Sequence, residues 1–211
     1  MANRKKNTTS AKETVLLVTA TRSEALYFNQ MRKDCRYMNV TVEWAGRDDL
    51  DLTKLINETS RLKRAGKYDH VWAVFGFDEV DTDVLEVSSM LEVAARKRIS
   101  LCWFNPCFEL WIALHAGPLA TVVQDPTPIK ARVGQALPGF EMSPEYLLTK
   151  GINLHLQLFP RHATADINAR NYNERAKNML GLEATNMPAL NSMLLDVCGQ
   201  ADMSHNQKAF K

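Results

Sequence analysis

Six carboxylates lie at or shortly after the ends of apolar runs that have the composition of buried strands. They are Glu24, Asp78, Glu79, Asp81, Asp83 and Glu109. Mg²⁺ typically takes one or two carboxylates and keeps several waters, and two such ions can clamp a phosphodiester during hydrolysis. The pattern therefore admits a magnesium-dependent hydrolytic site, or the remains of one.

Acids near the start of a helix also have a purely structural role, because they cap the helix and oppose its dipole. Asp81 and Asp83 fit this role well, since a helical pattern begins at Val84. Asp78 and Glu79 are harder to explain in this way, because they come directly after a strand-like run. If this region binds a metal, we expect these two residues to be the ligands.

Other reactive side chains have weaker patterns. His115 follows an apolar helical segment, and we expect a core or capping histidine rather than a catalytic one. No Gly-rich phosphate loop and no serine or cysteine nucleophile motif occurs. The four cysteines match no zinc spacing, and Cys102 and Cys107 resemble small core residues. Reduced thiols in a cytoplasmic protein are the simplest interpretation.

Four short runs rich in β-branched and aliphatic residues predict buried strands. They are residues 14–20, 40–44, 70–76 and 99–104. Helical patterns separate them, and strands that are apolar on both faces and alternate with helices are typical of a parallel sheet covered on both sides. We therefore expect an α/β fold with a mainly parallel four-stranded sheet, whose chemistry lies beyond the carboxyl ends of the strands.

The rest of the chain is expected to be largely helical. After the fourth strand, Asn105 is a candidate N-cap with Pro106 at the first helical position. Residues 117–138 contain four prolines and two glycines, which indicates a surface excursion. Two further helical patterns, residues 166–180 and 187–197, predict a C-terminal helical segment.

Composition is compatible with one globular domain. The chain has 211 residues, 45% of them hydrophobic, and a formal net charge of +2. We expect a basic flexible tail at 1–13, a single domain at 14–198 and a polar tail at 199–211. No apolar run reaches the length of a membrane span, so no membrane association is expected.

Two segments resemble a known family. YDHVWAVF (68–75), followed about 30 residues later by NPCFELWIALH (105–115), resembles the RloB family, and EATNMPALNSMLLDV (183–197) is a weaker match. These are small Toprim-like proteins found with bacterial restriction and phage-defence genes. The resemblance implies a nuclease fold in which a first-strand glutamate and an Asp-x-Asp pair on a later strand surround Mg²⁺.

This chain departs from that pattern at two positions. The place of the first-strand glutamate falls on Ala20, and the place of the first aspartate falls on Gly76. Neither residue can bind a metal through its side chain or transfer a proton, and losing a general base alone usually costs about two to four orders of magnitude in rate. The resemblance therefore implies an intact scaffold with a depleted acidic site.

Two classes of function remain open. One is a non-catalytic binding or regulatory subunit in anti-phage defence, with a defence-system protein, a second copy of the chain, or RNA or DNA as its partner. Arg22 and Arg47, with Lys97 and Arg98, would then supply positive charge for phosphate. The other is a nuclease that cleaves RNA (such as tRNA) or DNA with Mg²⁺ and a rearranged acid set, Glu24, Asp78, Asp81 and Glu109, of which we single out Glu24, Asp78 and Glu109 as the catalytic candidates.

Overall fold

The computed structural model describes residues 12–47 and 49–206. Its centre is a parallel sheet in the order β2-β1-β3-β4, which confirms the predicted fold class. The strands are β1 (Val15–Thr19), β2 (Val40–Trp44), β3 (His70–Gly76) and β4 (Ser100–Phe104). Because the order of the strands reverses direction between β1 and β3, a crevice is expected beyond the carboxyl ends of these two strands.

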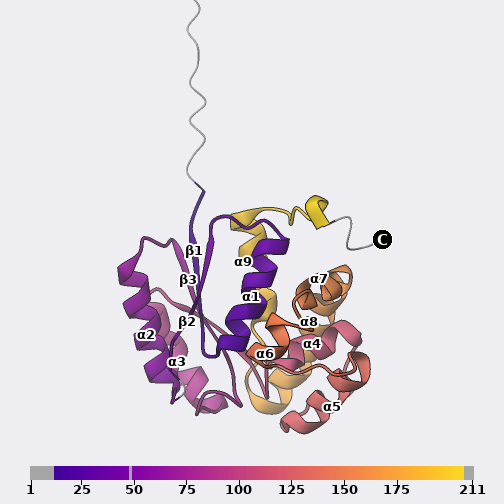
Figure 1. Cartoon of the computed structure of the whole chain (residues 1–211). Coiled ribbons are helices and arrows are strands. Elements are labelled where there is room, and N and C mark those ends of the chain that lie inside the picture. Colours follow the sequence, from indigo (N-terminus) through magenta and orange to yellow (C-terminus); the bar gives the residue numbers. More distant parts are fainter. Residues whose placement is uncertain (1–11, 48, 207–211) are drawn as a thin grey trace, which may run out of the picture.

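Helices cover both faces of the sheet (Figure 1). They are α1 (Arg22–Asp34), α2 (Leu52–Ala65), α3 (Val84–Arg96), α4 (Glu109–Ala116), α5 (Pro126–Ala136), α6 (Pro144–Leu148), α7 (Leu154–Leu158), the 3-10 turn η1 (Phe159–Arg161), α8 (His162–Leu180) and α9 (Met187–Cys198). On one face, α2 and α3 enclose a core with alternate strand residues such as Leu16 and Ala73. On the other, α1, α4, α8 and α9 enclose a larger core with Leu17 and Val74.

The alternation of the two cores explains why the strands lack polar positions. Successive side chains of a strand point to opposite faces, so a strand covered on both faces is apolar at nearly every position. All five residues of β1 are buried, as are six of the seven residues of β3. The strand predictions from the apolar runs are therefore confirmed to within one residue at each end.

The segment after β4 differs from its prediction. The helix was expected to begin at Pro106, but α4 begins at Glu109. The backbone nitrogen of Asn105 donates to Ala184 O, and Asp78 N donates to Pro106 O. The backbone groups of residues 105 and 106 are thus used in bonds to the segments around Ala184 and Asp78. They do not take part in helical hydrogen bonds, and α4 begins three residues later. The expected burial of this helix is confirmed, because Glu109 to His115 are all buried.

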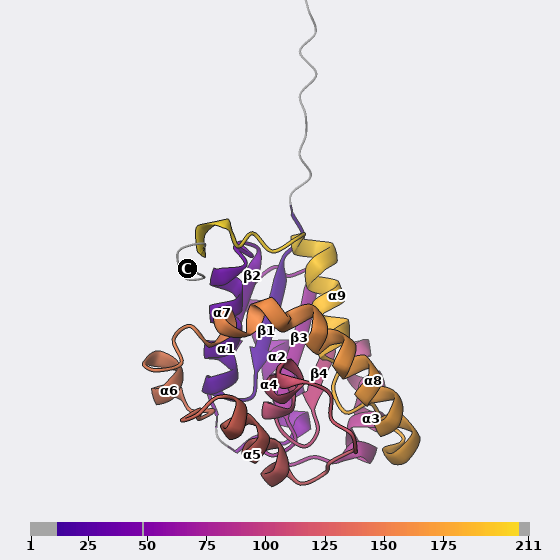
Figure 2. The ribbon, with the colours of Figure 1, turned by 90° about the vertical axis from the view of Figure 1, so that its right-hand side faces the viewer.

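The expected surface excursion at 117–138 contains the helix α5. Asp125 accepts a hydrogen bond from Thr127 N at 2.8 Å, and Pro126 occupies the first helical position. Ile129 and Val133 are buried where α5 packs on α4, and Figure 2 shows α5 beside α4 on the outer side of the molecule. The prolines of this region therefore flank or begin a helix, and Gly134 lies within it.

Both chain ends lie partly outside the described residues. Of the expected basic tail, only residues 12 and 13 are described. Of the expected polar tail, residues 199–206 are described, and they contact the end of α1: Arg36 pairs with Asp202 at 2.8 Å, and Asn206 donates to Asp34 O. Among the described residues, no helix is long and apolar enough to cross a membrane.

Candidate functional site

A cavity of about 640 Å³ opens beyond the carboxyl ends of β1 and β3, where the topology predicts it. We call it the cleft. Residues after β1, β2 and β3 line it together with the start of α4, the middle of α5 and residues 140–144 before α6. Three of its charged residues are cations and five are acids: Arg22, Arg47 and Lys130, with Glu24, Asp78, Glu79, Glu109 and Glu141.

Glu24 lies in the first turn of α1 and is almost fully buried, with 1% of its surface exposed. Thr21 caps this helix. Thr21 N donates to Glu24 Oε2 at 2.9 Å, and Glu24 N donates to the Thr21 hydroxyl, which forms a capping box. No described group hydrogen-bonds to the other oxygen, Oε1. Burial raises the pKa of Glu24 to about 8, so its carboxyl is largely neutral at pH 7.

Asp78 lies at the tip of β3 and forms an ion pair with a residue from a distant helix. Lys130 Nζ, from α5, donates to Asp78 Oδ2 at 2.9 Å and lies 3.9 Å from Glu109 Oε1. The Asp78 side chain is 15% exposed and that of Lys130 is 47% exposed. Partial burial works against the charged form of Lys130, yet the hydrogen bond to Asp78 and the nearby Glu109 carboxylate leave its pKa raised overall. One side-chain ammonium therefore neutralises Asp78 and partly offsets the charge of Glu109.

Glu109 is buried, and this burial raises its pKa. Its carboxylate, the Cys107 thiol and the Asp78 carboxylate each offer a ligand atom, and these atoms lie within 4.8 Å of one another. Glu79 is not part of that group, and desolvation raises its pKa as well. Among the described residues, Asp78, Cys107 and Glu109 form the one such group of potential ligands.

This group does not fit Mg²⁺. Magnesium requires near-ideal octahedral geometry with oxygen ligands and retains several waters, but one of these ligands is a thiol. Burial holds the pKa of Cys107 far above its usual range, so the thiol is protonated. Lys130 also places a positive charge where a cation would have to bind. A cation that bound beside Asp78 and Glu109 would have to displace Lys130.

The two positions that lack the expected acids are both buried. Ala20 is buried, and its carbonyl oxygen accepts a hydrogen bond from the indole nitrogen of Trp44 at 3.1 Å. At Gly76, an added Cβ atom would lie 2.8 Å from Asp78 Oδ1 and 3.3 Å from the backbone nitrogen of Phe108. The Asp78 carboxylate therefore occupies the space that a side chain at residue 76 would need.

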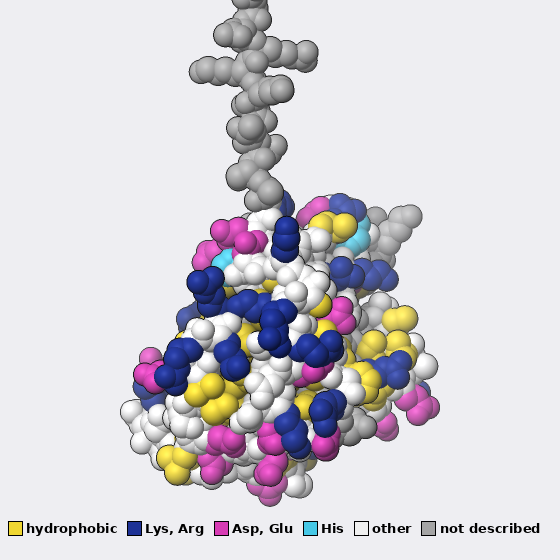
Figure 3. Space-filling model, turned by 90° about the vertical axis from the view of Figure 1, so that its left-hand side faces the viewer, with side chains coloured by type: hydrophobic (Ala, Val, Ile, Leu, Met, Phe, Trp, Pro, Cys, Tyr) yellow, Lys and Arg dark blue, Asp and Glu magenta, His cyan; other side chains and the backbone are white. Residues whose placement is uncertain are grey.

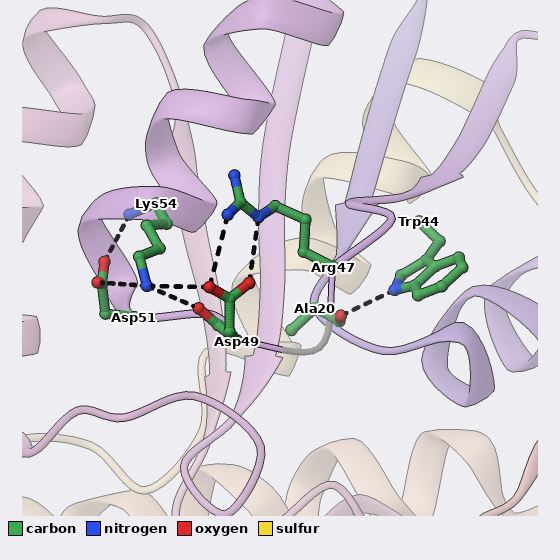
Figure 4. A network of polar contacts seen from close by, with 6 residues as sticks. All are labelled: Ala20, Trp44, Arg47, Asp49, Asp51 and Lys54. Carbon is green, nitrogen blue, oxygen red and sulfur yellow. Dashed lines mark hydrogen bonds and ion pairs between the residues drawn. The ribbon is translucent and has the colours of Figure 1, made fainter.

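The two arginines predicted to bind phosphate both line the cleft. Arg22 is exposed at the first position of α1. Arg47 is not free: its guanidinium contacts Asp49, with Nε 3.2 Å from Oδ1 (Figure 4). Lys54 also bonds to Asp49, so this acid is shared between two cations. A ligand phosphate would have to compete with Asp49 for Arg47.

Three other predicted residues lie away from the cleft. Lys97 and Arg98 were expected near its positive side, but they precede β4 and lie at the opposite edge of the sheet, where Lys63 Nζ donates to both of their carbonyl oxygens. Asp81 does not line the cleft, because its backbone nitrogen bonds to Leu50 O in a neighbouring hollow. The expectation that Lys97 and Arg98 supply positive charge to the cleft is therefore wrong. The proposed acid set of Glu24, Asp78, Asp81 and Glu109 does not come together, because Asp81 lies outside the cleft.

Two structural interpretations are confirmed. Asp83 caps α3 by accepting a hydrogen bond from Glu86 N at 2.8 Å. His115 is 3% exposed and its Nδ1 bonds to the carbonyl of Trp111, so it is a core histidine.

Sequence reasoning missed two charged residues of the cleft, Lys130 and Glu141, and did not anticipate Cys107 beside Asp78 and Glu109. Lys130 lies in the region expected to be a surface excursion. The Asp125–Pro126 pair and the four-residue spacing of Ile129 and Val133 are signals of a helix start and a buried face that predict α5. They do not by themselves indicate which side chain enters the cleft.

A family model described as RloB-like protein matches residues 15–193. The chain belongs to the RloB-like family. The match covers all four strands and most of the C-terminal helices, including the segment NPCFELW at the start of α4. No curated protein and no solved structure matches the chain.

Proposed function

We propose that this RloB-like chain is a non-catalytic binding or regulatory subunit of a bacterial anti-phage defence system, built on a Toprim-like nuclease scaffold. Its partner is a protein of that system, a second copy of the chain, or a nucleic acid that is held without being cut. The proposal rests on the state of the acids in the cleft, because the family relation alone does not distinguish a nuclease from a binding protein.

The single observation that carries the proposal is the ion pair between Lys130 and Asp78. A nuclease of this type needs its acids free to hold a divalent cation. Here an ammonium group 2.9 Å from Asp78 and 3.9 Å from Glu109 supplies the positive charge internally. Unlike a metal ion, an ammonium cannot lower the pKa of a bound water or act as a Lewis acid. The acids are thus neutralised without gaining the chemistry that a metal would supply.

Two further features support the same interpretation. Glu24 has a pKa of about 8 and is already committed to the cap of α1, so it is a poor ligand for a cation at neutral pH. The space beside Gly76 is taken by Asp78. A substitution that placed an acid at residue 76 would therefore displace the Asp78 carboxylate. The residues around Gly76 are thus packed in a way that leaves no room for a side chain there.

Calorimetric titration with MgCl₂ tests the proposal. We expect no saturable binding by the wild-type chain, and we expect Lys130→Met to bind a divalent cation more tightly than wild type because it removes the internal cation. Lys150→Met is the control, since Lys150 is an exposed lysine that does not line the cleft. Stoichiometric binding of Mg²⁺ by wild type that is lost in Asp78→Asn would contradict the proposal.

Nuclease activity is the second candidate, and one observation favours it. Asp78 and Glu109 come from different elements yet place carboxylate oxygens within 4.8 Å of each other. Two ligands of one Mg²⁺ are at most roughly 4.2 Å apart, so a small side-chain shift would bring both onto one ion. The discriminating assay incubates single- and double-stranded RNA and DNA, including tRNA, with the wild-type chain and Mg²⁺ or Mn²⁺. Cleavage that Glu109→Gln abolishes without lowering the melting temperature would establish the nuclease.

A further inference from the structure

A group of cations gathers at the amino edge of the sheet, on the side opposite to the cleft. It consists of residues at the ends of α2 and α3 and in the loops that follow them. We call it the basic cluster: Lys63, Arg64, Lys67, Arg96, Lys97 and Arg98. Figure 3 shows Lys and Arg side chains in a band across the upper half of this face. All members are exposed except Lys63, which is partly buried.

The two halves of the basic cluster are joined directly. Lys63 Nζ, in the last turn of α2, donates to Lys97 O at 2.8 Å and to Arg98 O at 3.1 Å. These bonds hold the loop after α3 against the end of α2, so cations that are about 35 residues apart in the chain form one surface. Burial lowers the pKa of Lys63, and the neighbouring guanidinium of Arg98 lowers it further. The cations are therefore close enough to repel one another.

Few acids offset this charge among the described residues. Asp69, two residues after Lys67, accepts its hydrogen bonds from Thr14. Arg96 reaches Glu92 only at 3.9 Å, and both side chains are largely exposed. Glu58 pairs with Arg61, one turn before the basic cluster. Like charges that face each other destabilise a folded protein. Basic residues in the last turn of a helix are explained by the helix dipole, but Lys67, Lys97 and Arg98 lie beyond the helix ends and need another reason.

The backbone at Arg98 adds an independent observation. Arg98 has a φ of 55°, and it stands at the position after the C-cap of α3, where Ile99 N bonds to Ala94 O and Arg98 N bonds to Ala95 O. Helices that end in this hydrogen-bond pattern favour glycine at that position, because a Cβ atom is unfavourable in the left-handed region. The chain carries an arginine there at a conformational cost, as it also does at Arg36 (φ 56°) outside the basic cluster. At Arg98 the carbonyl oxygen is also held by Lys63, which keeps this arginine beside the end of α2.

We propose that the basic cluster binds the phosphate backbone of a nucleic acid, on a surface separate from the cleft. The cluster has the two features that such a ligand requires: several cations on one face, and only one ion pair with an acid, the long 3.9 Å contact of Arg96 with Glu92, among the described residues. Binding relieves the mutual repulsion of the cations and releases counterions from the nucleic acid. No base-reading geometry is present in the cluster, so recognition is of the backbone and does not depend on sequence.

An acidic protein partner fits this surface less well. Protein interfaces are centred on buried aromatic or aliphatic anchors with charges at the rim. Of the large exposed apolar side chains of α3, Leu85 lies in the first turn at the other end of the helix, and Leu91, which is 38% exposed, lies more than one turn before Arg96. A surface made of cations alone is suited to a polyanion with regularly spaced charge.

Fluorescence anisotropy with a labelled DNA duplex of about 20 base pairs, and with an RNA duplex of the same length, tests the proposal across a salt series. EDTA is present, so any metal-dependent activity of the cleft does not enter the result. The key variant is Arg64→Glu/Lys97→Glu. Its control, Lys150→Glu/Lys177→Glu, makes the same change of charge at two exposed lysines outside the basic cluster. Melting curves verify that each variant is folded.

We expect the cluster variant to bind at least about tenfold more weakly than wild type. The slope of log K against log salt should fall by about one for each phosphate that the variant no longer neutralises. The control variant should change both quantities much less. Arg98→Gly, which suits the local backbone, should weaken binding without lowering the melting temperature, whereas Arg98→Lys should largely retain binding.

Three outcomes would overturn the proposal. The first is absence of binding by wild type at low salt. The second is an equal loss of affinity in the cluster and control variants, which would mean that only net charge matters. The third is displacement of the duplex by polyglutamate at a lower charge concentration than by unlabelled duplex, which would assign the surface to an acidic protein. None of these results depends on whether the cleft binds a metal.

Discussion

Lys130 Nζ lies 2.9 Å from Asp78 Oδ2, although the two residues are 52 positions apart in the chain. The contact joins the tip of β3 to α5 and places a positive charge between two acids of the cleft. Replacing Lys130 leaves Asp78 and the buried Glu109 carboxylate without their counter-charge.

Lys130→Met should lower the free energy of unfolding only slightly, by about 1 kcal/mol or less, because Lys130 is about half exposed and solvent screens the pair. Urea denaturation at neutral pH measures this change. A loss of several kcal/mol would show that the ion pair is a major source of stability rather than a neutralising contact.

Gly76→Ala should destabilise the protein by about 1–3 kcal/mol, because the new Cβ atom would press on Asp78 Oδ1 and on the backbone of Phe108. Gly134→Ala is the matched control. Gly134 is exposed within α5, and a Cβ atom there meets no other atom within 4 Å, so this variant should be stabilised by about 0.5–1 kcal/mol. Urea denaturation of both variants measures the difference, and equal effects would refute the steric explanation.

Glu24→Gln should make the protein more stable than wild type at high pH and leave it nearly unchanged at low pH. The folded-state pKa of Glu24 is about 8, above its ordinary value of 4.5, because of burial. A raised pKa means that the folded state retains a proton that the unfolded state loses, so wild type loses stability as the pH rises from 4.5 to 8. Glutamine can still accept the hydrogen bond from Thr21 N. Melting temperatures between about pH 4 and 9 test this, and parallel curves for the two proteins would contradict it.

His115→Gln should reduce the acid sensitivity of the fold. Burial lowers the pKa of His115 to about 4, assisted by the nearby His162, His155 and Arg161. Since the unfolded value is 6.5, the unfolded state binds a proton first, and stability is complete above pH 6.5 and falls as the pH drops toward 4. The wild-type loss from this one group is about 2–3 kcal/mol.

The measurement is the free energy of unfolding at several pH values in that window. Other groups also titrate there, including His162, whose pKa burial lowers to about 4. The informative quantity is therefore the difference in slope between wild type and His115→Gln. Identical slopes would mean that the fold does not lower the pKa of His115.

The sequence by itself determined the sheet and the burial of its central helix. The runs around Val15 and His70 are apolar at nearly every position, as expected of strands covered on both faces, while the edge run around Val40 is richer in polar residues. The same reasoning predicted that Glu24, Asp78 and Glu109 approach one cleft, because parallel strands bring their carboxyl ends to one edge of the sheet.

The tertiary structure alone decided which charges meet. Lys130 reaches Asp78 because α5 packs on α4 through Ile129 and Val133, a long-range contact that local patterns do not encode. It also separated Lys97 and Arg98 from the cleft, since residues near a strand can lie at either edge of the sheet. Local patterns predict elements because each element satisfies its own backbone and faces, but a site forms from side chains of several elements, and their meeting depends on how the elements pack.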